Sequence, residues 1–154
     1  MKRRFLLQTL ASLAGAALAP GLMAQTRRRV EVWKDPDCGC CKDWVSHLEA
    51  SGFQVKVHDS GNAAARARLG VPEKMGSCHT AQIGGYALEG HVPARDIRRL
   101  LKERPKAVGL AVPGMPVGSP GMDGPAYNGR KDPYDVLLLQ ADGGSRVYQS
   151  YHRS

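Results

Sequence analysis

The chain has 154 residues, of which 42% are hydrophobic and 23% are charged, and its formal net charge at pH 7 is +8. This length predicts a single domain. Basic residues beyond the N-terminus alternate with acidic ones, as in Arg95-Asp96 and Lys102-Glu103-Arg104. Because no basic stretch is interleaved with aromatic residues, the charge does not indicate a nucleic-acid-binding protein.

The first 24 residues have the organisation of a cleaved export signal. They begin with the basic run Lys2-Arg3-Arg4, continue through an apolar stretch rich in small residues, and end at Ala24. Polar residues and Pro20 interrupt the apolar stretch, so a lasting membrane span is not expected. Removing this segment takes away three basic and no acidic residues, which lowers the net charge from +8 to +5. We therefore expect a signal peptide at 1–24, a flexible N-terminal stub at 25–29 and one domain at 30–154.

Hydrophobic periodicity predicts the secondary structure of the remaining chain. In chain order, the predicted elements are a strand at 30–33, a helix at about 41–50, a strand at 53–58, a short helix at 62–69, strands at 78–83 and 86–92, and a helix between Pro93 and Pro105. The first strand, helix and second strand form a βαβ unit, so those two strands should be parallel.

The C-terminal third combines an irregular loop with a hairpin. Glycine, proline and methionine recur from Gly109 to Gly124, and the glycines and prolines are too frequent for regular structure. Residues 134–140 and 145–151 flank the turn residues Asp142-Gly143-Gly144 and predict a β-hairpin or meander.

The element order β-α-β-α-β-β-α, with cysteines directly after the first strand, is the thioredoxin arrangement. It predicts an α/β fold with one mixed sheet and helices on both faces, followed by a Gly/Pro/Met-rich loop and a C-terminal β-hairpin. In this arrangement the loop before the third strand returns beside the start of the first helix. We therefore expect Cys78 and His79 to lie next to Cys38, Cys40 and Cys41, although they are far apart in the sequence.

Three of the four cysteines are crowded on one strand-to-helix turn, at Cys38, Cys40 and Cys41. A helix N-terminus stabilises an anion, so a thiolate there is a better nucleophile and a better metal ligand. Disulfides between such close cysteines would close almost no loop and would restrict the unfolded chain very little. The crowding therefore favours a reactive or metal-binding cluster over purely structural disulfides.

Several motifs together resemble a known family. In order, they are Cys38-Gly-Cys-Cys41, Trp44, Cys78-His79-Thr80, Glu89-Gly-His-Val-Pro93, and the loop from Val112 to Met122. The set resembles domain-of-unknown-function family 411, the CopG-type periplasmic copper-resistance and metal-binding proteins, over about residues 30–151. The resemblance implies a thioredoxin-like fold, copper handling and thiol redox chemistry in the periplasm, with Cys78 as the fourth sulfur. Its implied partners are copper ions and other periplasmic copper-resistance or redox proteins.

The donor atoms favour copper. Soft thiolates select Cu(I), zinc or iron–sulfur clusters. Zinc sites usually use separated cysteine pairs, whereas sulfurs packed this tightly suit bridging between several Cu(I) ions. The ligand hypothesis adds His79 and the thioethers of Met115 and Met122. Structural alternatives stay open, because His79 and Cys78 would point to opposite faces of a regular strand and a Gly-Met repeat can pack its methionines on the core.

The other histidines carry a weaker signal. His91, near a strand end, is a possible ligand, but a structural role is favoured. His47, two turns into the first helix, is expected at the surface, and His58 and His152 have no evident partner. Trp44, on the same helix as His47, is expected to pack beside the sulfurs.

The predicted function is a periplasmic Cu(I)-thiolate binding protein with redox-active cysteines, and the alternative is a thiol-disulfide or copper oxidoreductase. Cys38 and Cys41 have the Cys-x-x-Cys spacing of many such enzymes, with Cys40 between them. A neighbouring cysteine can resolve a mixed disulfide. Cys78 replaces the proline that thioredoxins have before the third strand, which favours a metal or electron role. In a merged hypothesis, two disulfides store four electrons and their reduction gives four thiolates for copper.

Overall fold

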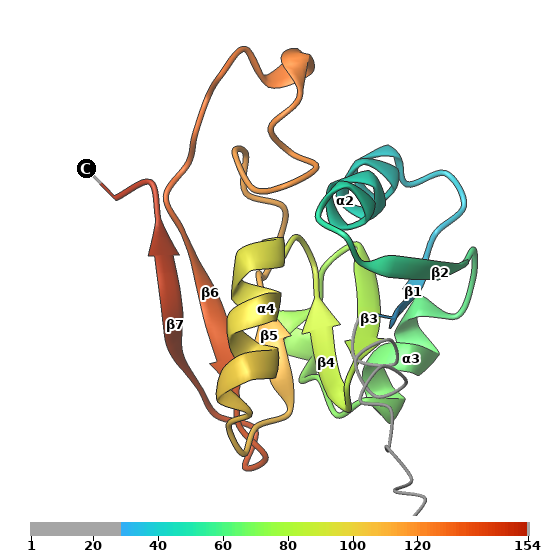
Figure 1. The fold of residues 1–154 in the computed structure, drawn as a ribbon, viewed down its shortest axis with the longest axis vertical. Coiled ribbons are helices and arrows are strands. Elements are labelled where there is room, and N and C mark those ends of the chain that lie inside the picture. Colours follow the sequence, from blue (N-terminus) through green and yellow to red (C-terminus); the bar gives the residue numbers. More distant parts are fainter. Residues whose placement is uncertain (1–28, 154) are drawn as a thin grey trace, which may run out of the picture.

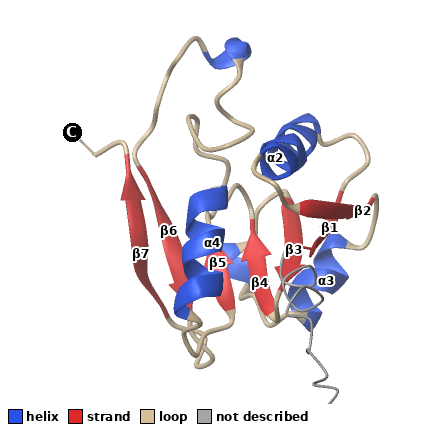
Figure 2. Cartoon of the chain, viewed as in Figure 1, coloured by secondary structure: helices blue, strands red, loops and turns tan. Residues whose placement is uncertain are grey.

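A computed structural model describes residues 29–153; the predicted signal peptide at 1–24 and the stub up to residue 28 lie outside the described residues. The elements, which Figures 1 and 2 show, are β1 (Arg29–Lys34), α2 (Gly39–Ala50), β2 (Gln54–His58), α3 (Asn62–Arg68), a 3₁₀ turn η1 (Glu73–Met75), β3 (His79–Ile83), β4 (Tyr86–Glu89), α4 (Ala94–Glu103), β5 (Gly109–Ala111), a second 3₁₀ turn η2 (Pro125–Tyr127), β6 (Tyr134–Leu139) and β7 (Ser145–Tyr151). The predicted order from the first strand to α4 is confirmed. None of the helices in residues 29–153 has the length and hydropathy required to span a membrane.

The strands of residues 29–153 form one mixed sheet of seven strands, in the order β2-β1-β3-β4-β5-β6-β7. The first two strands are parallel, as predicted. β3 runs antiparallel to β1 and places His79 opposite Lys34. The end of β1 therefore lies beside the start of β3, and the segments that carry the cysteines continue from these two positions.

Helices cover both faces of the sheet. One hydrophobic cluster includes Trp44 and Leu48 of α2 together with Ile97 and Leu100 of α4. A second, smaller cluster contains Ala87 of β4 and Val71, which follows α3. Leu88, the residue next to Ala87 in β4, belongs to the first cluster. Since adjacent strand residues point to opposite faces, α2 and α4 cover one face and the α3 region covers the other.

The start of the predicted irregular loop is a strand, contrary to our expectation. β5 lies inside the sheet, parallel to β4 and antiparallel to β6. A Cβ atom on Gly109 would come within 1.8 Å of the Ala87 carbonyl oxygen, so glycine permits the close approach of these two strands. Gly109, which suggested irregular structure, thus allows two strands to pack closely. The predicted C-terminal hairpin of β6 and β7 is confirmed.

The irregular loop from Val112 to Met122 packs against the start of α2. Gly121 has φ +86°, and a Cβ atom there would lie 2.6 Å from the Cys40 carbonyl oxygen and 2.8 Å from the Trp44 amide nitrogen. A glycine is therefore required where this loop crosses the helix that carries the cysteines. Figure 1 shows the loop, in orange, beyond the end of the sheet on the side of α2.

We expect Gly121→Ala to lower the free energy of unfolding by at least about 2 kcal/mol, because it combines backbone strain with a steric clash against α2. Urea unfolding followed by circular dichroism measures the change. The matched control is Gly124→Ala, since Gly124 has φ −71° and a Cβ atom added there would have no neighbour within 4 Å. Equal stability of the two variants would contradict the packing described here.

Candidate metal centre

The cysteine turn is built by local backbone contacts between β1 and α2. The Asp35 side chain accepts a hydrogen bond from the Asp37 amide at 2.9 Å, and the Asp35 carbonyl accepts one from the Cys38 amide at 3.2 Å. α2 begins at Gly39, two residues earlier than predicted, with Cys38 as its N-cap residue. Cys40 and Cys41 therefore lie in the first helical turn.

The four cysteine sulfurs lie within 4.8 Å of one another, so the predicted convergence of Cys78 with the turn is confirmed. Cys38 and Cys41 form a disulfide, whereas Cys40 and Cys78 are free thiols. Cys40 Sγ lies 3.6 Å from Cys38 Sγ and 3.9 Å from Cys78 Sγ. The Cys40 sulfur is thus close to both the disulfide and the Cys78 thiol.

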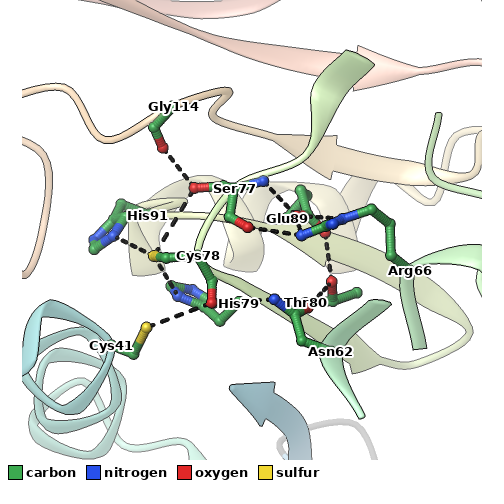
Figure 3. A network of polar contacts seen from close by, with 10 residues as sticks. All are labelled: Cys41, Asn62, Arg66, Ser77, Cys78, His79, Thr80, Glu89, His91 and Gly114. Carbon is green, nitrogen blue, oxygen red and sulfur yellow. Dashed lines mark hydrogen bonds and ion pairs between the residues drawn. The ribbon is translucent and has the colours of Figure 1, made fainter. Parts of the chain in front are cut away.

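Two histidines face the Cys78 sulfur. His79 Nδ1 lies 3.3 Å and His91 Nε2 lies 3.1 Å from Cys78 Sγ, and both rings are fully buried. Figure 3 shows the sulfur between the two rings. These three residues form a second group with ligand atoms within 4.8 Å of one another.

The two histidines reach the sulfur for different structural reasons. β3 begins at His79, so Cys78 precedes the regular strand and the expected alternation of faces does not separate the two side chains. His91 follows β4 after Gly90, whose φ of +69° bends the chain. The sequence argument favoured a structural role for His91 and missed its contact with Cys78. The glycine directly after a strand was the available signal for this bend.

Burial keeps both imidazoles neutral. It lowers the pKa of His79 to about 3, with a further lowering from His91, and it also lowers the pKa of His91. His91 Nδ1 lies 2.7 Å from the Pro120 carbonyl oxygen, which can only accept a hydrogen bond. Nδ1 of the neutral ring therefore carries the proton, and Nε2 presents its lone pair to Cys78.

The Cys78 thiol is held in its protonated form. Burial, followed by the proximity of Cys40, raises the pKa of Cys78 to about 12. Cys40 and Cys41 lie in the first turn of α2, whereas Cys78 lies on the segment that leads into β3. A cation at this position would replace the thiol proton, as metal binding to cysteine generally does.

A buried ion pair fixes the segment that carries Cys78. Glu89 is fully buried, and its Oε1 accepts hydrogen bonds from Arg66 Nε at 2.9 Å and from the Ser77 amide at 2.6 Å. Arg66 also donates to the Ser77 carbonyl at 2.6 Å, and Asn62 Nδ2 donates to the Cys78 carbonyl at 3.1 Å. Figure 3 shows this network beside the sulfur. The α3 side of the sheet thus determines where Cys78 lies.

The two candidate methionines occupy different environments. Met115 has a relative exposure of 51%, and its Sδ lies 4.0 Å from Cys40 Sγ. Met122 has a relative exposure of 9%, and its Sδ accepts a hydrogen bond from Tyr127 Oη at 3.2 Å. The structure therefore brings Met115 to the cysteines and packs Met122 against Tyr127.

Trp44 packs beside the centre, as expected. Its indole is fully buried, donates to the Val92 carbonyl at 2.9 Å and lies with its ring centroid 4.2 Å from that of His79. Trp44 therefore forms one wall of the histidine pair.

The remaining histidines lie outside the centre. His47 was expected at the surface, but it is half-buried, and its Nε2 accepts a hydrogen bond from the Ala94 amide at 3.1 Å, which joins α2 to α4. Burial lowers the pKa of His47, in keeping with this acceptor role. His58 stacks on Trp33. His152 contacts the ring of Tyr134 edge-on.

Comparison with known proteins identifies relatives of the whole domain. The family described as "Protein of unknown function, DUF411" matches residues 75–122. Two solved structures described as copper resistance protein CopG, form 1 and form 2, also match. Form 1 has 52% identity, a TM-score of 0.73 and coverage of 80% of this chain and 96% of its own. Form 2 has 50% identity, a TM-score of 0.74 and coverage of 80% and 98%. No curated protein matches the sequence.

The fold and the site define a mixed α/β protein with a cysteine- and histidine-rich centre where a strand end meets a helix start. The matches cover 80% of this chain and nearly the full length of the two solved structures, and about half of the aligned residues are identical. The chain therefore belongs to the family of copper resistance protein CopG, which confirms the resemblance drawn from the motifs.

We expect Glu89→Gln to lower the free energy of unfolding by about 3 kcal/mol, because it leaves the Arg66 guanidinium half-buried without its anionic partner. Urea unfolding provides the measurement. The matched control is Glu31→Gln, which removes an exposed carboxylate 3.5 Å from Lys56 and should cost less than about 1 kcal/mol. A Glu89→Gln protein as stable as the control would show that the buried pair does not hold the Cys78 segment.

Proposed function

We propose that this chain is a periplasmic Cu(I)-thiolate binding protein with redox-active cysteines that acts in copper handling and resistance. The observation that carries the proposal is the meeting of four cysteine sulfurs with the imidazoles of His79 and His91 at Cys78. The two relatives are named as copper resistance proteins, and this name points to copper among the metals that such donors accept.

The donor chemistry fits copper as the bound cargo. Thiolate and thioether sulfurs select Cu(I), and imidazole also suits copper. Both histidines are neutral, as a ligand must be. Each histidine presents a ring nitrogen to the Cys78 sulfur, His79 through Nδ1 at 3.3 Å and His91 through Nε2 at 3.1 Å. Our proposed ligand set is Cys38, Cys40, Cys41, Cys78, His79, His91 and Met115; we leave out Met122 because its sulfur is engaged by Tyr127.

The cysteine spacing favours Cu(I) over zinc. Structural zinc sites usually take cysteines in separated pairs, whereas Cys40 and Cys41 are adjacent and Cys38 is two residues away. A thiolate can bridge two soft ions, so the proposal includes a site with more than one Cu(I) ion.

One disulfide supports control of copper binding by redox state. The merged hypothesis assumed two disulfides, but in residues 29–153 the structure holds one, between Cys38 and Cys41. Two electrons and two protons break this S–S bond and give two thiols. Cys40 and Cys78 are already free, so reduction doubles the thiols of the centre from two to four. A thiol reductant or a redox partner protein of the periplasm would supply the electrons.

We further infer a thioredoxin-like fold. The supporting features are the strand order β2-β1-β3-β4, the parallel β1–β2 pair, and the disulfide at the start of the first helix of the domain. β5, β6 and β7 extend this core at one edge.

We expect the reduced protein to bind Cu(I) more tightly than the oxidised protein, because reduction adds two soft donors. Anaerobic titration with a chromophoric Cu(I) chelator, together with thiol counting, measures affinity and stoichiometry in both states. Comparable affinities in the two states would contradict the redox control. Binding of zinc in preference to Cu(I), or no bound copper, would contradict the proposed function itself.

A matched histidine pair sharpens this titration. His91→Asn should weaken Cu(I) binding by about tenfold or more, whereas His58→Asn, which changes a ring stacked on Trp33 away from the centre, should leave it unchanged. Circular dichroism confirms that both variants are folded.

The alternative function is a thiol-disulfide or copper oxidoreductase, and the Cys38–Cys41 disulfide is the observation that favours it. Cys38 is half-buried and Cys41 is fully buried, so an external thiolate would attack Cys38 Sγ. The S–S bond then breaks and Cys41 leaves as a thiolate in the first turn of α2, where the helix dipole stabilises it.

We expect the protein to reduce insulin disulfides slowly in the presence of dithiothreitol, and Cu(I) to suppress even this reaction, because copper occupies the same sulfurs. Turbidity of the precipitating insulin chains follows the reaction. Cys38→Ser is the control, since it removes the attacked sulfur. Fast turnover that copper does not affect would favour the oxidoreductase over the binding protein.

A further inference from the structure

The exposed position of Met115 has no structural explanation. The loop from Val112 to Met122 contains two Gly-Met pairs, and Met122 is buried as packing predicts. Met115 keeps 51% of its surface exposed, although burial of such a side chain typically contributes about 1.5–3 kcal/mol. Its sulfur instead lies 4.0 Å from Cys40 Sγ.

This exposure does not come from a loosely held backbone. On one side of Met115, the Gly114 carbonyl accepts a hydrogen bond from Ser77 Oγ at 2.5 Å, which Figure 3 shows beside Cys78. On the other side, the Pro116 carbonyl accepts hydrogen bonds from Ser119 Oγ at 2.7 Å and from the Ser119 amide at 3.2 Å. The chain on both sides therefore holds Met115 at the outer edge of the sulfur cluster.

The donors form a series from the solvent to the interior. Exposed Met115 contacts half-buried Cys40, whose sulfur lies 3.9 Å from Cys78 Sγ. Cys78 in turn contacts the fully buried rings of His79 and His91. Each neighbouring pair of donor atoms is close enough to contact the same ion in succession.

We infer that Met115 is the first ligand that an incoming Cu(I) ion meets and that it sets the rate of copper exchange more than the equilibrium affinity. This inference rests on the proposed function. A thioether carries no proton, so it binds a soft cation without first losing one. The bond from Cu(I) to its donor breaks as the bond to Met115 Sδ forms. The ion then passes to Cys40, whose thiol proton leaves to water, and its oxidation state does not change.

The test compares Met115→Leu with Met122→Leu, which makes the same change at the buried methionine of the same loop. Leucine keeps the approximate volume of methionine and removes the sulfur. Stopped-flow absorbance under anaerobic conditions follows the transfer of Cu(I) from the loaded, reduced protein to excess bicinchoninate, and from the bicinchoninate complex to the empty protein. Equilibrium competition with the same chelator gives the affinity.

We expect Met115→Leu to slow transfer in both directions by about tenfold or more, with a much smaller change in affinity, and Met122→Leu to match the wild type. Transfer by Met115→Leu at the wild-type rate would overturn the inference and leave the proposed function standing. An affinity loss with unchanged loading rate would also overturn it, because Met115 would then be an ordinary equilibrium ligand. Failure of the wild type to bind Cu(I) would overturn both.

Discussion

The antiparallel pairing of β1 with β3 is the constraint on which the centre depends. It sets Lys34, the last residue of β1, opposite His79, the first residue of β3. The chain leaves β1 into the cysteine turn and arrives at β3 through Cys78, so one register of backbone hydrogen bonds brings the two segments together. A slip by one residue would turn every β3 side chain to the opposite face. Ala81 and Ile83, two residues apart on the same face of β3, are both buried in the main core and resist such a slip.

The scaffold around Cys78 is polar on one face of the sheet and apolar on the other. On the α3 side, buried Glu89 and Arg66 hold the backbone at Ser77, and Asn62 holds the Cys78 carbonyl. Taking a carboxylate and a guanidinium out of water is costly, and hydrophobic residues of the same volume often stabilise a protein as well or better. This buried pair forms hydrogen bonds with the backbone of one loop. Its main role is therefore to hold that loop in position, more than to stabilise the fold. On the α2 side, the indole of Trp44 packs against the His79 ring and restricts its orientation.

Much of the fold was predictable because its determinants are local. Alternating residues in β1 and the helical spacing of Trp44 and Leu48 need no distant partner to be recognised. The proximity of Cys78 to the turn followed once these elements were ordered. β5 was missed because glycine is typical of turns and loops, so Gly109 did not suggest a strand. Its close contact with Ala87 exists only in the folded sheet. His91 was set aside because its contact with Cys78 exists only in the folded protein, although Gly90 was a local signal for the bend that directs it there. The disulfide pairing was left open because the sequence alone allows several partners for Cys38.

The start of α2 is compatible with both redox states that we propose for the centre. Cys38 and Cys41 are three residues apart, so they lie on one side of the first turn of α2 and can be joined without unwinding it. The Gly121 backbone packs against the Cys40 carbonyl, and the Lys42 amide donates to the Cys38 carbonyl at 3.4 Å. These contacts are made by backbone atoms and do not involve the S–S bond. Opening the disulfide therefore changes the number of sulfur donors while the backbone that positions them keeps its own restraints. The proposed redox change would therefore alter the chemistry of the centre at little conformational cost, which suits the proposed uptake and release of a soft ion.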